Sequence, residues 1–194
     1  MVAGIAGLQA VENRLLPPLL MHSGVAWLLE CAPVSAVSPA ISLPRHRLLF
    51  EDDLWVWPFR AQFDRLPLAT AALPALLIRH LFWTGSRFEM LDELVRVLKP
   101  GGLLVSVSLN PWHRAAWRIA RDRRGRLPAW PVFLWLHRRL GLMVLPGLPA
   151  WRQCISPLLV IVARKPPQAI GRQRALNTAT VHRTARAGLH GGSC

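Results

Sequence analysis

Acidic residues follow two short apolar runs in the first part of the chain. Glu30 comes after the apolar residues 25–29, and the acidic cluster 51–53, which includes Asp52, comes after residues 48–50. In dinucleotide-binding folds, a carboxylate about twenty residues after the first strand holds the ribose hydroxyls. The spacing therefore suits hydrogen bonds from two strand ends to a nucleotide. The alternative for the 51–53 cluster is a solvated turn.

The elements that must position these groups are clearest in residues 86–111. Ser86 and Glu89 have the spacing of a capping box, which marks the start of a helix. The apolar stripe of this helix consists of Phe88, Leu91, Leu94, Val95 and Leu98. Pro100 and Gly101 end the helix, and residues 103–109 form a β-rich apolar run. This helix–turn–strand unit predicts an α/β sheet, in which ligands bind beyond the carboxyl ends of the strands.

The same unit resembles the class I S-adenosylmethionine-dependent methyltransferases, whose fifth strand follows a helix ending in E-x-x-R-V-L-K-P-G-G. The matching residues are Glu93, Arg96, Val97, Leu98, Lys99, Pro100, Gly101 and Gly102. The Asn110-Pro111 pair is similar to the loop after this strand in small bacterial type 11-like methyltransferases. The resemblance implies a Rossmann-like, mostly parallel sheet with an antiparallel closing strand, and S-adenosylmethionine as cofactor. The alternative is that Lys-Pro-Gly-Gly serves only to stop a helix.

The resemblance also implies roles for individual residues. Asp64 would accept a hydrogen bond from the adenine amino group, and Leu66 belongs to the same short segment. Residues 73–82 correspond to the fourth strand, and His80 lies where that strand opens toward the cofactor. A core-edge histidine bonded to the backbone is an equal alternative for His80. The implied cofactor-binding residues are Glu30, Ala32, Asp52, Asp64, Leu66 and His80.

The chain departs from the family at the glycine-rich turn after the first strand. Glycine lets the backbone approach the cofactor closely, but the corresponding positions here are Ala32, Val34 and Ala36. Val34 is β-branched and disfavours positive φ. We therefore expect a reduced or degenerate N-terminal half. The sequence identifies no catalytic residue.

Composition narrows the class of protein. The 194 residues are 52% hydrophobic, which excludes a wholly disordered chain. No uncharged apolar run reaches the roughly 18 residues of a membrane span, and no basic n-region indicates a signal peptide. The three cysteines and seven histidines show neither disulfide nor zinc spacing, so no metal site is predicted. These features favour a cytoplasmic protein.

Charge is concentrated in the second half. Residues 1–99 hold nine basic and nine acidic residues, whereas residues 100–194 hold fifteen basic residues and one acid. Residues 110–151 form a basic, tryptophan-rich insertion, and we expect residues 110–139 to form a mobile cover over the cleft that selects an anionic acceptor. Its first residues, Asn110, Trp112 and His113, correspond to the acceptor side of the family's site. Base composition is the alternative origin of the charge, and a surface helix packed on the sheet is the alternative for the insertion.

The sequence thus predicts one methyltransferase-like domain over residues 1–165 and a basic, disordered tail over residues 166–194. The favoured function is methyl transfer from S-adenosylmethionine to an unidentified acceptor. The alternative is a degenerate relative without catalysis that binds an anionic partner, either nucleic acid or a membrane surface. Nucleic acid has no supporting motif, and the sequence does not indicate the oligomeric state.

Overall fold

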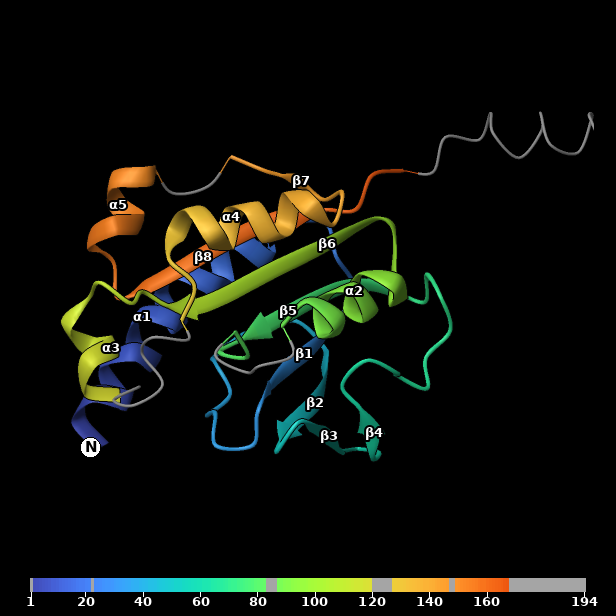
Figure 1. Cartoon of the computed structure of the whole chain (residues 1–194), viewed down its shortest axis with the longest axis horizontal. Helices are drawn as coiled ribbons and strands as arrows, with labels where there is room; N and C mark the ends of the chain where they lie inside the picture. Colours follow the sequence, from blue (N-terminus) through green and yellow to red (C-terminus); the bar gives the residue numbers. More distant parts are fainter. Residues whose placement is uncertain (1, 22, 83–86, 120–126, 147–148, 168–194) are drawn as a thin grey trace, which may run out of the picture.

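A computed structural model describes residues 2–21, 23–82, 87–119, 127–146 and 149–167. Its centre is an eight-stranded sheet in the order β4-β3-β2-β1-β5-β6-β8-β7 (Figure 1). The strands are β1 (Leu28–Pro33), β2 (Arg45–Glu51), β3 (Leu54–Trp57), β4 (Ala61–Gln62), β5 (Leu73–Arg79), β6 (Leu98–Leu109), β7 (Met143–Val144) and β8 (Leu158–Arg164). Sequence neighbours β5 and β6 pair directly, and α2 connects them.

The four middle strands β2, β1, β5 and β6 run parallel. Strand β8 lies antiparallel to β6, and β3 lies antiparallel to β2. The apolar residues 103–109 are buried within β6, between β5 and β8. This arrangement confirms the prediction of a central parallel strand and an antiparallel closing strand. The fold is a mixed α/β sheet of the Rossmann-like class I methyltransferase type.

Helices cover both faces of the sheet (Figure 1). On one face, α2 (Arg87–Val97) and α4 (Trp130–Arg139) pack on side chains that include Leu76 and Ile78 of β5. On the other face, α1 (Val2–Met21) and α3 (Arg114–Ile119) pack on side chains that include Ala75 and Leu77. Alternate residues of one buried strand therefore serve two cores, as the period of two requires. The short helix α5 (Ala150–Ile155) precedes β8. None of the described helices is long and apolar enough to span a membrane.

Helix α2 ends at Val97 and β6 begins at Leu98, so the Lys-Pro-Gly-Gly sequence forms the start of the strand. Gly101 has a φ of 76°, which favours glycine, and a Cβ on Gly102 would lie 2.7 Å from the carbonyl oxygen of Lys99. Lys165 Nζ donates hydrogen bonds to carbonyl oxygens at the end of α2, including those of Val95 and Leu98. The predicted helix stop is therefore also a site where a charged side chain caps the helix C-terminus.

The N-terminal half differs from the expected elements. Helix α1 continues to Met21 through Pro17 and Pro18, although a pair of prolines in a sequence usually predicts a break in a helix. Buried Leu16 and Leu20 flank the prolines, so side-chain packing outweighs the lost backbone hydrogen bonds. Strand β1 begins at Leu28, three residues later than expected, so Glu30 lies inside the strand. A loop joins β1 to β2, and β2 enters a hairpin with β3, which confirms a reduced N-terminal half.

Within the basic insertion, α4 packs against the sheet. Phe133, Leu136 and His137 of α4 are buried against the sheet. His137 Nδ1 donates to the Phe133 carbonyl oxygen, and its Nε2 is 2.7 Å from Ser106 Oγ on β6. The expectation that this segment covers the cleft is therefore wrong for α4, because its apolar face is committed to the core. Residues 120–126 of the insertion, which include Arg121, Arg123 and Arg124, and nearly all of the tail lie outside the described residues.

Candidate functional site

The carboxyl ends of β1, β5 and β6 border a cavity of about 110 Å³. Its walls come from α1, the segment after β1, the end of β5, the last residue of β6 and α3. The lining residues are Leu8, Gln9, Glu12, Pro33, Ser35, Ala36, Val37, Arg79, His80, Leu109 and Ile119. Open α/β sheets bind their ligands at this edge. The charged members of the lining are Glu12 and Arg79, with His80 beside them.

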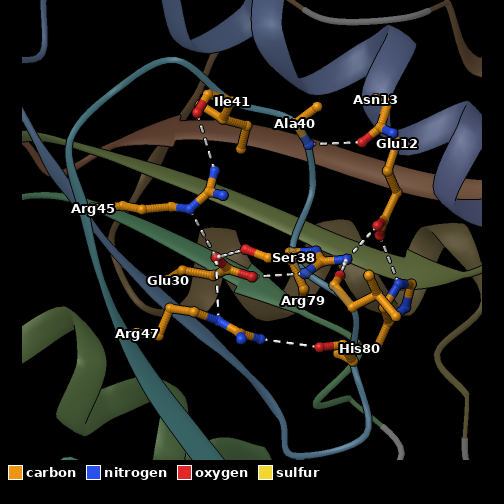
Figure 2. A network of polar contacts seen from close by, with 12 residues as sticks. Glu12, Asn13, Glu30, Ser38, Ala40, Ile41, Arg45, Arg47, Arg79 and His80 are labelled. Atoms are coloured by element: carbon orange, nitrogen blue, oxygen red, sulfur yellow. Dashed lines mark hydrogen bonds and ion pairs between the residues drawn. The ribbon is translucent and has the colours of Figure 1, made fainter.

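Arg79, the last residue of β5, connects three segments at this edge (Figure 2). Its Nη1 donates to Glu30 Oε1 of β1 at 2.6 Å, and its Nη2 donates to Glu12 Oε2 of α1. The same Nη2 donates to the carbonyl oxygen of Val37 at 2.9 Å. The Arg79 side chain is only 2% exposed. A buried guanidinium therefore holds α1 and the post-β1 loop against the end of the sheet.

Glu30 is fully buried and has several partners besides Arg79. Ser38 Oγ donates to Glu30 Oε2 at 3.1 Å, and the Nε atoms of Arg45 and Arg47 lie 3.5 Å and 3.7 Å from that oxygen. Both oxygens of Glu30 thus face protein donors. Burying a carboxylate is costly unless protein donors surround it. The observed contacts of Glu30 are therefore those of an ion-pair network within the protein.

His80 follows β5 directly and has a φ of 54°. Its Nε2 is 2.7 Å from Glu12 Oε1. Nε2 donates a hydrogen bond to this carboxylate oxygen when it carries a proton. Burial raises the pKa of Glu12, but the hydrogen bond and charge of His80 and the charge of Arg79 lower it more. Glu12 is therefore a carboxylate at neutral pH. A histidine and a carboxylate in contact can hold and move a proton.

The segment between β1 and β2 carries no glycine-like turn. The described residues with positive φ are Gly24, Asp52, Asp53, Ala71, His80, Gly101 and Gly141. None of them lies between residues 31 and 44. Arg47 Nη2 donates to the Ala36 carbonyl oxygen at 3.0 Å, and Asn13 Oδ1 of α1 accepts from the Ala40 amide. Side chains therefore hold this loop in place where the family uses a flexible glycine backbone.

Three of the six implied cofactor residues lie on β1 or directly after β5, beside the cavity. Glu30 and His80 take part in the network, and Ala32 is buried within β1. Asp52 and Asp53 form the exposed turn of the β2–β3 hairpin, with φ values of 46° and 61°. Because β2 runs parallel to β1, this turn also lies at the carboxyl edge, but neither residue lines the cavity.

Leu66 lies at the opposite edge of the sheet, and Asp64 is two residues before it. The Leu66 amide donates to Glu93 Oε1 at 2.7 Å, and Arg96 donates to the carbonyl oxygens of Leu66 and Leu68. Since α2 ends near Arg96, where β6 begins, these contacts mark the amino edge of the strands. The hydrogen bond to Arg96 lowers the pKa of Glu93; burial opposes the shift, and the Leu66 amide adds to it. Glu93 and Arg96, the E-x-x-R part of the motif, thus hold the loop before β5 in place by hydrogen bonds.

The three residues expected on the acceptor side differ in burial and in hydrogen bonding. Asn110 is buried; its Nδ2 donates to the carbonyl oxygens of Gln153 and Ser156, and its Oδ1 accepts from the Trp112 amide. The Trp112 side chain is exposed. His113 Nδ1 accepts from the Ala115 amide at the start of α3, and burial, followed by the charge of Arg114, lowers the His113 pKa. Asn110 therefore connects chain segments.

Sequence reasoning missed Glu12 and Arg79, which organise the edge. Glu12 is the only acid in the first 29 residues, and Leu8, Glu12, Leu16 and Leu20 recur every four residues. An acid on the buried stripe of an apolar helix indicates a buried partner. Arg79 ends the apolar run of β5, which gives the matching signal. The two signals together could have predicted the ion pair.

Comparisons with known proteins concern the fold. No family model and no curated protein match the sequence. A structure of a methyltransferase dependent on S-adenosylmethionine from Aquifex aeolicus is similar, with a TM-score of 0.56 and 13% identity over 84% of this chain and 97% of that chain. The chain has the class I methyltransferase fold. A methyltransferase from Archaeoglobus fulgidus gives a TM-score of 0.54 at 11% identity, covering 83% of this chain and 94% of that chain. One from Thermotoga maritima gives 0.52 at 14% identity, covering 81% and 89%.

The methyltransferase fold implies S-adenosylmethionine, and the cavity tests whether that cofactor fits. The cavity measures about 110 Å³, whereas pockets for small molecules usually measure ~300–1,000 Å³. Glu30 has both oxygens on protein donors, and the segment after β1 lacks a glycine-like turn. In this arrangement the residues at the edge do not fit the whole cofactor.

Proposed function

We propose that this chain transfers a methyl group from S-adenosylmethionine to an unidentified acceptor, with the cofactor at the carboxyl edge of β1, β5 and β6. The fold carries the proposal. This chain has a parallel run of β2, β1, β5 and β6, closed by antiparallel β8, and its fold is similar to that of methyltransferase structures with TM-scores of 0.52 to 0.56. The cavity lies at the edge where such sheets bind ligands.

A buried donor at this edge supports a polar ligand there. Arg79 Nε is buried and has no hydrogen-bond partner among the described residues. Buried donors usually find an acceptor, so an incoming polar group would satisfy this one. Methyl transfer depends mainly on positioning the acceptor, and Trp112 and His113, beyond the end of β6, are the candidates for the acceptor side.

The contact between α1 and β5 is the part of the edge that must open. Glu12 reaches from α1 to both Arg79 and His80, and these three side chains line the cavity (Figure 2). When only an open state binds a ligand, its apparent affinity falls in proportion to the population of that state. Weakening the Glu12 contacts should therefore strengthen cofactor binding.

Calorimetric titration with S-adenosylmethionine and S-adenosylhomocysteine tests the proposal. We expect both compounds to release or absorb heat with one-site stoichiometry, and Glu12→Gln to bind more tightly than the parent. Asp92→Asn is the matched control, because it also removes one carboxylate but lies exposed on α2. It should bind as the parent does. The proposal would be refuted if neither the parent nor Glu12→Gln bound either compound.

The closed edge favours a second candidate, a methyltransferase-fold protein without catalysis that binds an anionic partner. The ion pairs of Arg79 fill the place where the family holds its cofactor, and the second half of the chain is strongly basic. This candidate predicts no heat with either cofactor compound. It also predicts binding to a polyanion or an anionic surface that weakens steeply with salt.

A further inference from the structure

Three large apolar side chains are exposed at the end of the molecule where α1, α3 and α5 lie (Figure 1). Trp112 is 76% exposed, Trp151 is 60% exposed and Ile155 is 66% exposed. A single exposed apolar residue is ordinary, but three in adjoining segments form a patch that indicates interaction. We call the surface formed by Arg14, Trp112, Arg114, Arg118, Trp151 and Ile155 the helical end face.

Hydrogen bonds hold the segments of this face together. Asn110 Nδ2 donates to the carbonyl oxygens of Gln153 at 3.0 Å and Ser156 at 2.8 Å. The Asn110 side chain therefore joins the segment that carries Trp112 to the segment that carries Ile155. Helix α3 packs beside α1, so its residues belong to the same end.

A groove of about 590 Å³ runs between α1 and α5. Its lining residues are Ala10, Val11, Arg14, Leu15, Trp151, Ile155 and Ser156. Most of this lining is apolar, and Arg14 is its only charged member. The groove thus combines an aliphatic floor with a cation, which suits an amphiphile that bears a negative head group.

The charge of the helical end face is one-sided. Arg14, Arg114 and Arg118 are exposed, while Glu12, the acid of α1, is buried against Arg79. The exposed acids of the described residues lie in the β2–β3 hairpin and on α2, which Figure 1 shows away from α3 and α5. This distribution creates a positive field on the face that carries the exposed tryptophans.

We propose that the helical end face docks onto a membrane surface that carries anionic phospholipids. Tryptophan rings prefer the head-group level of a bilayer, and arginines bind lipid phosphates. Ile155, Val11 and Leu15 offer aliphatic surface to acyl chains, whereas nucleic-acid bases stack on aromatic side chains. The apolar face of this helical end would lie in the interface plane without crossing the bilayer. The proposal is independent of methyl transfer.

Cosedimentation of the full chain with vesicles tests the docking. The probes are vesicles of phosphatidylcholine alone and of phosphatidylcholine with phosphatidylglycerol. We expect binding to the anionic vesicles only, falling steeply as salt rises. The variant W112S/W151S/I155S should lower the partition coefficient by about tenfold or more, since it removes the inserting side chains.

A matched variant separates this face from general stickiness. W57S/V132S/W135S also removes two exposed tryptophans and one exposed β-branched residue, from β3 and α4. It should bind vesicles as the parent does.

Charge reversal supplies a second arm. Arg14→Glu, Arg114→Glu and Arg118→Glu together should abolish binding to anionic vesicles. Reversal of the exposed Arg60, Arg65 and Arg138 gives the same net charge and should weaken binding much less. Thermal melting of each variant checks folding, and only variants that melt within a few degrees of the parent are compared.

Two results would overturn the docking proposal. One is equal binding, or no binding, to the two kinds of vesicle by the parent. The other is equal loss in the face variants and their matched controls. Binding of a single-stranded oligonucleotide that depends on this face, without vesicle binding, would assign the face to nucleic acid instead. Titration with S-adenosylhomocysteine is a separate readout, so failure here leaves the methyl-transfer proposal unaffected.

Discussion

Replacing Arg79 by methionine removes the cation that joins Glu12 and Glu30 while keeping an unbranched side chain that can fill part of the space. Arg79 and Glu12 are each 2% exposed, and Glu30 is fully buried. The change leaves two buried carboxylates at the end of the sheet. Glu12 retains His80, and Glu30 retains Ser38 and two arginines at longer distances.

The expected loss can be estimated from these contacts. Breaking a buried ion pair by removing one partner costs about 3–5 kcal/mol. Arg79 has two carboxylate partners, but both keep other donors, so we expect the loss to stay near the value for one pair. For a chain of this size, about 3–5 kcal/mol lowers the melting temperature by about 10 °C.

Urea denaturation at pH 7, followed by circular dichroism, measures the change in unfolding free energy. The pKa of Glu12 is lowered in the folded state below its ordinary value of 4.5. Its stabilising contribution is therefore present above pH 4.5 and is lost as pH falls through the folded-state pKa. The difference between parent and Arg79→Met should accordingly shrink in acid.

A compensating variant sharpens the test. E12Q/E30Q/R79M removes all three charges together and should recover much of the stability, because no buried charge is left without a partner. Arg47→Met is the control, since Arg47 is 32% exposed and lies 3.7 Å from Glu30. A loss below about 1 kcal/mol in Arg79→Met, the range of an exposed pair, would refute the account of a buried network.

Two further changes test the supports of the sheet. Burial lowers the pKa of His137 to about 4 in the folded state. Above pH 6.5 the residue is neutral in both the folded and the unfolded state. As the pH falls from 6.5 toward 4, only the unfolded state binds the proton. Stability should fall by about 3 kcal/mol over this range, and His137→Phe should remove that slope in urea titrations; an unchanged slope would contradict a neutral buried histidine. Glu93→Ala should cost about 1–3 kcal/mol at pH 7, because the buried Leu66 amide loses its acceptor. Faster amide exchange at Leu66 would accompany the loss, and unaltered exchange would show that another group holds this loop.

The part of the fold that local patterns determine was predictable. The α2–β6 unit has an apolar stripe and a glycine turn, and the helix and the strand that they predict are both present. The boundary between them differs, because α2 ends at Val97 and β6 already begins at Leu98. Strand β1 was placed three residues early because its burial on both faces leaves no alternation to mark where it starts. The prolines of α1 were misleading because tertiary packing, which local rules do not contain, holds the last turn.

The candidate site was predictable only in part. Glu30 and His80 were expected at the carboxyl edge and lie there, but Leu66 was placed by resemblance and belongs to the opposite edge. The shortened connection between β1 and β2 shifts the following segments, so motif spacing no longer indicates position. Arg79 and Glu12 are 67 residues apart, and a pair at that separation is visible only once the topology is known.

The most direct test of the central proposal is an amide ¹H–¹⁵N spectrum of the full chain titrated with S-adenosylhomocysteine. The account predicts saturable shifts at residues 33–37, at Arg79 and His80, and at the start of α3. Leu66 and Leu68, at the amino edge, should stay unchanged. Shifts confined to the amino edge, or no shifts at a large excess of the compound, would contradict a cofactor site at the carboxyl ends of β1, β5 and β6.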